Sequence, residues 1–214
     1  MQPDGEAAFL AHHFPDAPTQ EHAARLGMWL FLATEILLFT ALFTAYALYR
    51  YLYSDTFHAA SKYIETSIGL TNTVVLITSS LTVALALHAV RRGHGRRAAA
   101  LLLVTLAFGG VFMALKGVEY HHHFATGQLP GRYYAFAELT APGAAMFFTV
   151  YFLMTGLHGV HVLVGMGVLA WLAGRAWRGD FSAAYHTPVE LGGLYWHLVD
   201  MIWIYLFPLL YLIG

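Results

Sequence analysis

The chain has 214 residues, of which 58% are hydrophobic and only 11% are charged, and its formal net charge is −1. A soluble domain is about 45–50% apolar and about 25% charged, so this chain has too few polar side chains to cover a water-soluble surface. The near-zero net charge gives no basic field that would attract nucleic acid. The sequence contains no cysteine, which excludes disulfides, thiolate metal sites and iron–sulfur clusters.

Five stretches are long and apolar enough to cross a bilayer core of about 30 Å, which takes about 20 residues of helix. They predict an all-α fold, an integral membrane bundle of five transmembrane helices. We expect one membrane domain, 26–214, after a polar tail, 1–25, that lacks the positive start and apolar core of a secretory signal. The predicted helices are residues 26–49, 66–90, 98–118, 143–171 and 191–213.

Basic residues gather in the segments on one side of the membrane that the five predicted helices would cross. The side that holds Arg25 and the segments 91–97 and 175–178 is richer in arginine than the side that holds Arg50, Lys62 and Arg132. Because loops rich in Lys and Arg stay in the cytoplasm, this bias places the N-terminus inside and the C-terminus outside. The polar tail is therefore expected to be cytoplasmic.

Two carboxylates and a histidine interrupt the apolar stretches at similar depth. Glu35 and Asp200 lie about nine residues into their helices and His161 about ten residues from the same surface, which is roughly 13 to 15 Å deep. An ionisable side chain in hydrocarbon costs a few kcal/mol, so it must face protein, a partner, headgroups or water. Two interpretations stand: a proton-holding or helix-coupling cluster, or hydrogen bonds that only hold helices together.

Two other motifs carry histidines within helices. In TGLHGVH, glycines beside His158 and His161 let a second helix approach closely, so packing is favoured over a metal site, which would need further ligands. In KGVEYHHH, Lys116 and Glu119 are spaced i,i+3 and can form an ion pair that closes the helix against a neighbour. A membrane desaturase would need several His boxes, and the sequence has no HxxxH or second HxxHH.

The sequence has no GxSxG motif, no Walker loop and no dinucleotide-binding motif in a strand–helix context. Aromatic residues that share a helix face with Asp200 favour a packed interface over a cofactor site. The chain alone is therefore expected to contain neither a catalytic centre nor a metal site.

Several segments resemble subunit III of the haem–copper oxidases. They occur in the family's order over all five predicted helices: LGMWLFLATEILLF, TNTVVLITSS, KGVEY, TGLHGVHVLVG and HTPVELGGLYWHLVDMIWIYLFPLLY. The resemblance implies an all-helical subunit bound to the side of catalytic subunit I, with subunit II and further respiratory subunits as additional partners. It also implies that haem and copper lie in those partner subunits and that this chain carries no cofactor of its own.

The resemblance further assigns residues to motif positions. Glu35 corresponds to a buried membrane carboxylate of the family, and Arg25 at the mouth of the first helix is expected to meet a lipid phosphate. Subunit III of the family is thought to stabilise subunit I, to sustain proton uptake at its inner face and to hold structural phospholipids. The other polar residues on motif positions are Lys116, Glu119, His158, His161, His186, Glu190, His197 and Asp200.

Seven-helix members of the family have two further helices before the segment that corresponds to LGMWLF, and those helices form one wall of a lipid-filled cleft. Here a polar tail occupies that place, as in the five-helix bacterial forms. A lipid cleft would therefore need another subunit as its second wall. The expected location is a bacterial inner membrane.

The sequence thus predicts a non-redox, structural or modulatory subunit III of a proton-pumping terminal oxidase, which reduces oxygen to water. One alternative is an accessory subunit of nitric oxide reductase, whose core holds non-haem iron where the oxidase holds copper. The other is a stand-alone proton channel or transporter built on Glu35, His161 and Asp200, which the absence of internal repeats and broken helices disfavours. The electron donor, cytochrome c or quinol, and the haem type belong to other subunits.

Overall fold

A computed structural model of the chain describes residues 10–213, and over those residues its regular elements are all helices. Five segments are long and apolar enough to cross a membrane, which confirms the predicted all-helical membrane bundle. They are α1 (Ala17–Leu52), α3 (Thr66–Arg91), α4 (Gly95–Ala125), α5 (Ala144–Arg178) and the stretch Thr187–Leu212, which comprises α6 (Thr187–Phe207) and η2 (Pro208–Leu212).

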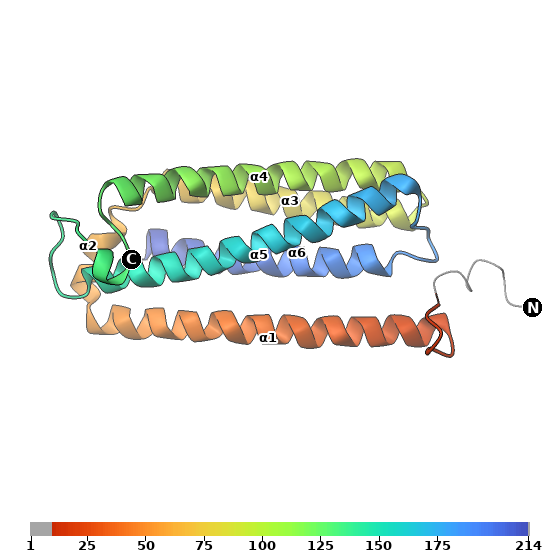
Figure 1. Ribbon diagram of the computed structural model, residues 1–214, viewed down its shortest axis with the longest axis horizontal. Coiled ribbons are helices and arrows are strands. Elements are labelled where there is room, and N and C mark those ends of the chain that lie inside the picture. Colours follow the sequence, from red (N-terminus) through yellow and green to blue (C-terminus); the bar gives the residue numbers. More distant parts are fainter. Residues whose placement is uncertain (1–9, 214) are drawn as a thin grey trace, which may run out of the picture.

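The helices form an elongated bundle in which α3 and α4 pair closely along one side. Next to this pair lie α5 and α6, and α1 runs along the opposite side, where it contacts α5 and α6 (Figure 1). Two short elements, α2 (Ser54–Ser61) and η1 (Gly131–Tyr133), lie in the connections at one end. We call this end, which also carries the α4–α5 connection 126–143, the loop end.

The first helix begins earlier than expected, within the segment predicted to be a tail. The carboxylate of Asp16 accepts a hydrogen bond of 2.8 Å from the backbone N–H of Thr19, and a proline in the first turn also favours a helix start. Hydrogen bonding by Thr19, first through its side chain and then through this backbone N–H, holds the pKa of Asp16 below its usual value of 3.8. Because the cap lies upstream of the apolar run, α1 extends beyond the stretch that hydropathy alone would define.

The last membrane segment also differs from the predicted helix 191–213. It begins at Thr187, because Pro188 suits the first helical turn, where its missing N–H is not needed. Its α-helical part ends at Phe207, since Pro208 cannot donate a backbone hydrogen bond, and the chain continues as the π-helix η2. This turn places Tyr211 in the buried interior at the loop end.

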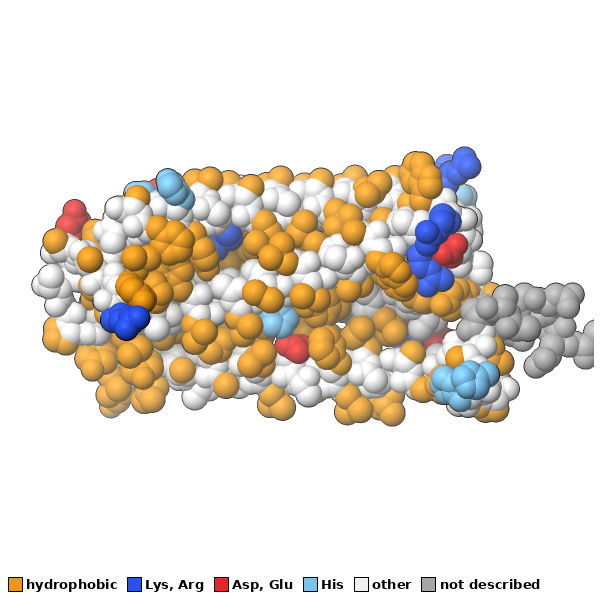
Figure 2. Space-filling view, in the orientation of Figure 1, with side chains coloured by type: hydrophobic (Ala, Val, Ile, Leu, Met, Phe, Trp, Pro, Cys, Tyr) orange, Lys and Arg blue, Asp and Glu red, His pale blue; other side chains and the backbone are white. Residues whose placement is uncertain are grey.

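Close packing between the helices depends on glycines that face large aromatic rings. A Cβ atom on Gly165 of α5 would lie 2.9 Å from the ring of Trp196, and one on Gly69 of α3 would lie 2.8 Å from Phe207 and Tyr211. Outward-facing hydrophobic side chains cover the length of the bundle, and basic side chains gather mainly towards its ends (Figure 2). This distribution is the one that a hydrocarbon environment requires.

Candidate functional site

The structure pairs two of the three predicted midplane residues across the α1–α5 interface. Nε2 of His161 lies 2.8 Å from Oε2 of Glu35, and the two side chains are 13% and 16% exposed. The Phe39 ring packs against the imidazole in a T-shaped arrangement with 5.2 Å between ring centroids. The pair therefore lies midway along both helices, at the margin of the bundle.

Hydrogen bonding restricts where the protons of this pair reside. Nδ1 of His161 lies 2.8 Å from the backbone oxygen of Leu157. Because a carbonyl oxygen only accepts, Nδ1 must carry a hydrogen and donate it. The contact between Nε2 and Glu35 then also needs one hydrogen, held either by an imidazolium facing a carboxylate or by a carboxylic acid facing a neutral imidazole. Both forms are neutral overall, so the pair can hold a proton within the bundle without a net charge.

Asp200 does not join this pair, and no hydrogen bond or ion pair links it to Glu35 or His161 within residues 10–213. It is 6% exposed on α6, where it lies beside Ser80 of α3 and its Oδ1 atom has no partner. Ser80 also hydrogen-bonds Nδ1 of His197 at 2.8 Å. Depth along a helix is readable from sequence spacing, but the direction in which α6 presents Asp200 depends on how the bundle packs.

The predicted pair of Lys116 and Glu119 is the centre of a larger buried cluster. Nζ of Lys116 donates to Oε2 of Glu119 at 3.0 Å and to the hydroxyl oxygens of Tyr151 and Tyr211 at 3.0 and 2.9 Å. Both tyrosine hydroxyls donate to Oε1 of Glu119, at 2.5 and 2.6 Å. The cluster joins α4, α5 and η2, and its ammonium and carboxylate groups compensate each other inside the protein.

Sequence reasoning did not find Tyr151 and Tyr211 as members of this cluster. Each stands in a run of apolar residues, where a tyrosine is an ordinary core or interface residue. The sequence did indicate that further partners must exist, because a buried ammonium and carboxylate such as Lys116 and Glu119 need more hydrogen bonds than they can give each other. The sequence did not indicate which helices would supply them.

His158 packs between aromatic rings, with ring-centroid distances of 5.5 Å to Phe112 and 5.2 Å to Trp203. It is completely buried, and neither ring nitrogen has a hydrogen-bond partner. Trp203 in turn donates from its indole N–H to the hydroxyl of Thr73 at 3.0 Å. His158 thus forms part of the aromatic packing that joins α4, α5 and α6.

At the end opposite the loop end, Glu190 of α6 links three helices. It forms ion pairs of 3.1 Å with Arg25 of α1 and with Arg91 of α3. Nε2 of His186 lies 3.7 Å from the same carboxylate, and Arg25 also pairs with Glu21 at 2.7 Å. Arg25 is therefore engaged by two carboxylates, although its Nε atom is buried without a partner.

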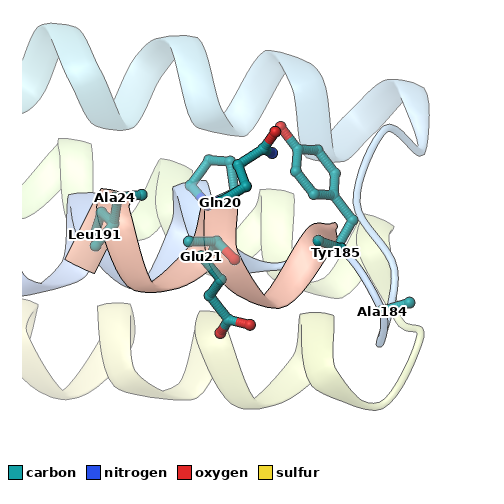
Figure 3. Close-up of a pocket in the computed structure, with 9 residues that line it drawn as sticks. Gln20, Glu21, Ala24, Ala184, Tyr185 and Leu191 are labelled. Atoms are coloured by element: carbon teal, nitrogen blue, oxygen red, sulfur yellow. The ribbon is translucent and has the colours of Figure 1, made fainter. Parts of the chain in front are cut away.

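A pocket of about 220 Å³ lies at this end, between the first turns of α1 and the residues that lead into α6 (Figure 3). The side chains of Gln20 and Tyr185 point towards each other at its rim, and Glu21 lies beside them (Figure 3). Within residues 10–213, no group of three or more His, Asp or Glu side chains is arranged to hold a metal ion.

Comparison with known proteins gives the family. The family model for cytochrome c oxidase subunit III matches residues 4–214. Cytochrome c oxidase subunit 3 of the earthworm Lumbricus terrestris is 31% identical, over 98% of this chain and 76% of the relative. Subunit 3 of the cytochrome bo(3) ubiquinol oxidase of Pseudomonas aeruginosa is 30% identical, over 88% of this chain and 84% of the relative. With a five-helix membrane bundle and a match along nearly its whole length, the chain belongs to the cytochrome c oxidase subunit III family.

Proposed function

We propose that this chain is the accessory subunit III of a haem–copper terminal oxidase and that its Glu35–His161 pair holds a proton beside the catalytic subunit. The observation that carries the proposal is the 2.8 Å contact between Nε2 of His161 and Glu35, with Nδ1 committed to the oxygen of Leu157. A pair that must contain one shared hydrogen is suited to store or pass a proton. Its partial exposure gives it access to a neighbouring subunit.

Subunit I is the proposed main partner and subunit II a further one, by analogy with the oxidases named above. Haem and copper would be bound in those subunits and would supply the oxygen chemistry. This chain would stabilise subunit I and support proton uptake. A bacterial inner membrane is the proposed location, and the similarity to the Pseudomonas aeruginosa subunit supports it.

Phospholipid is the proposed occupant of the space beside α1. An apolar groove of about 330 Å³ separates α1 from α6 in the half of the bundle towards the loop end. In a membrane this groove faces hydrocarbon, so an acyl chain would fill it. Arg25, at the opposite end of α1, remains the proposed headgroup contact of a separate phospholipid in the other leaflet, although Glu21 and Glu190 already occupy its guanidinium. The groove is lined by Ile36, Phe39, Thr40, Phe43, Leu198, Met201, Ile202 and Tyr205.

The proton role is tested in the intact oxidase with Glu35→Gln, which keeps the size of the side chain but removes its proton exchange. We expect unchanged haem content, together with a lower ratio of protons pumped to electrons transferred or fewer turnovers before inactivation. Glu138→Gln, which neutralises an exposed acid in the α4–α5 connection, is the matched control and should leave both quantities unchanged. Normal pumping and normal turnover lifetime in Glu35→Gln would rule out the proton role.

A further inference from the structure

A polar contact links α3 and α6 at a place separate from the Glu35–His161 pair. Nδ1 of His197 lies 2.8 Å from the hydroxyl oxygen of Ser80, which also lies beside Asp200. The imidazole is only partly buried, and its Nε2 atom has no hydrogen-bond partner within residues 10–213. Nε2 is also not sealed inside the bundle, so this nitrogen can be reached from the surface of the chain.

His197 lies near the middle of the last membrane segment. It is about ten residues from Thr187, where α6 begins, and Ser80 is about as far from Arg91, where α3 ends at the same end of the bundle. With a rise of about 1.5 Å per residue, both side chains are roughly 15 Å from that end. Because a hydrocarbon core is about 30 Å thick, neither lipid headgroups nor bulk water lie at this depth.

Exposed apolar side chains flank this nitrogen on both helices. Ile77 lies one turn from Ser80 on α3, and Ile204 lies two turns from His197 on α6, and these side chains are 50% and 41% exposed. A lipid acyl chain would cover both isoleucines, but it has no polar atom to offer Nε2. An imidazole nitrogen left without a partner in hydrocarbon costs free energy. The position therefore requires a polar group from another protein segment.

We propose that the α3–α6 face around His197 docks a transmembrane helix of a neighbouring subunit, whose hydroxyl or carboxamide side chain hydrogen-bonds Nε2. The contact with Ser80 allows two neutral forms of the ring: Nδ1 accepts from the hydroxyl and Nε2 carries the hydrogen, or Nδ1 donates and Nε2 presents a lone pair. Hydroxyl and carboxamide groups both donate and accept, so they satisfy either form. Hydrogen bonds of this kind hold membrane helices together.

Neighbouring polar groups of α3 do not call for an outside partner in the same way. Ser79 accepts a hydrogen bond of 2.9 Å from the indole N–H of Trp196, so it is satisfied within the chain. The amide atoms of Asn72 lack partners, but the residue is fully buried and no external group reaches it. Nε2 of His197 combines a free hydrogen-bonding position with access from outside. The proposal holds whichever subunit supplies the helix, so its test is independent of the proposed proton role.

The first test is photo-cross-linking of the tagged full-length chain in its native membrane, with benzoylphenylalanine in place of Ile77. On illumination the benzophenone group reacts with C–H bonds of whatever lies against it. We expect a covalent adduct with a membrane-spanning segment of a different polypeptide, identified by mass spectrometry after purification under denaturing conditions. An adduct with lipid alone would overturn the proposal, and so would an adduct that joins two copies of this chain.

The second test measures the yield of the same cross-link when the imidazole is changed. His197→Leu should lower the yield by about threefold or more, whereas His197→Gln, which still donates and accepts, should retain most of it. His88→Leu, which removes an exposed histidine in the last turn of α3, is the matched control and should leave the yield unchanged. An unchanged yield in His197→Leu would overturn the role of Nε2. If that variant does not accumulate in the membrane, the first test still decides the proposal.

Discussion

The buried charges of Lys116 and Glu119 are stabilised by the ion pair between them and by hydrogen bonds from neighbouring side chains. Lys116 and Glu119 are 7% and 2% exposed at their side chains, and two tyrosine hydroxyls complete their hydrogen bonding. Taking a charge out of water costs several kcal/mol, which a partner must offset. The stability of the loop end therefore depends on the whole cluster being present.

Lys116→Met removes the ammonium and leaves Glu119 buried without its cation. Breaking a buried pair in this way costs about 3–5 kcal/mol, and we expect a loss of that order in unfolding titrations of the purified chain in mixed micelles. Lys116→Met combined with Glu119→Gln should recover at least half of the loss, because the amide is neutral and still accepts from the tyrosines. A single variant that loses less than about 1 kcal/mol would show that the pair is not effectively buried.

Individual residues also show which contacts can be predicted from the sequence. The i,i+3 spacing of Lys116 and Glu119 suffices to predict their contact, because it depends on one helix alone. Depth along α1 and α5 places Glu35 and His161 at one level, but only the packing of the two helices brings them into contact. Asp200 lies at the same depth but beside a different neighbour. The rotation of α6 about its own axis decides which helix Asp200 faces, and that rotation depends on the packing of the whole bundle.

At the scale of elements, glycines determine how closely α5 and α6 approach. Gly165 lies against the ring of Trp196, whereas Gly167, on the same helix, has no heavy atom within 4 Å of an added Cβ. A rigid indole cannot move aside as the end of a flexible side chain can. The two positions therefore form a natural comparison within one helix.

Gly165→Ala should lower the free energy of unfolding by about 1–3 kcal/mol, because the added methyl group overpacks the α5–α6 interface. Gly167→Ala should be neutral or slightly stabilising, since alanine is the better helix former and meets open space. Both changes are measured by unfolding in mixed micelles. Equal effects at the two positions would contradict the close contact with Trp196.

The start of α1 has a pH dependence of its own. Hydrogen bonds from the side chain and the backbone N–H of Thr19 hold the pKa of folded Asp16 below its usual value of 3.8. The cap therefore stabilises the first turn above a pH of about 4, and this contribution disappears as the pH falls through the folded pKa. Hydrogen-exchange protection of the Thr19 and Gln20 amides should decrease on acidification in the native chain and should already be low at neutral pH in Asp16→Ala. Protection that does not change with pH would contradict the cap.

Element boundaries followed the sequence only in part. Long apolar runs identified all five membrane segments, since hydropathy reflects transfer into lipid. The cap at Asp16 and the proline at residue 188 start α1 and α6 before their apolar runs begin. The proline at residue 208 ends the α-helical part of the last segment before its apolar run ends. Caps act through local backbone hydrogen bonds, which hydropathy does not report.

Of the five membrane segments within residues 10–213, α1 has the smallest buried share. In an apolar 18-residue stretch of α1 only 11% of the residues are buried. The buried residues of the whole helix, Leu32, Phe39 and Tyr46, recur every seven positions along a single narrow face. Polar contacts fasten α1 along its length, through Glu190 at one end, His161 in the middle and the backbone oxygen of Leu209 near the other end. The faces of α1 on either side of this seam are available to lipid or to a partner subunit.

The most direct test of the central claim is to purify the tagged chain from its native membrane in mild detergent and to analyse what accompanies it. Our account predicts stoichiometric large partner subunits, a haem signal in the reduced-minus-oxidised spectrum, and copper in the metal analysis. Haem with non-haem iron and no copper would instead assign the chain to a nitric oxide reductase. A colourless chain that purifies without partners would contradict a role as an oxidase subunit.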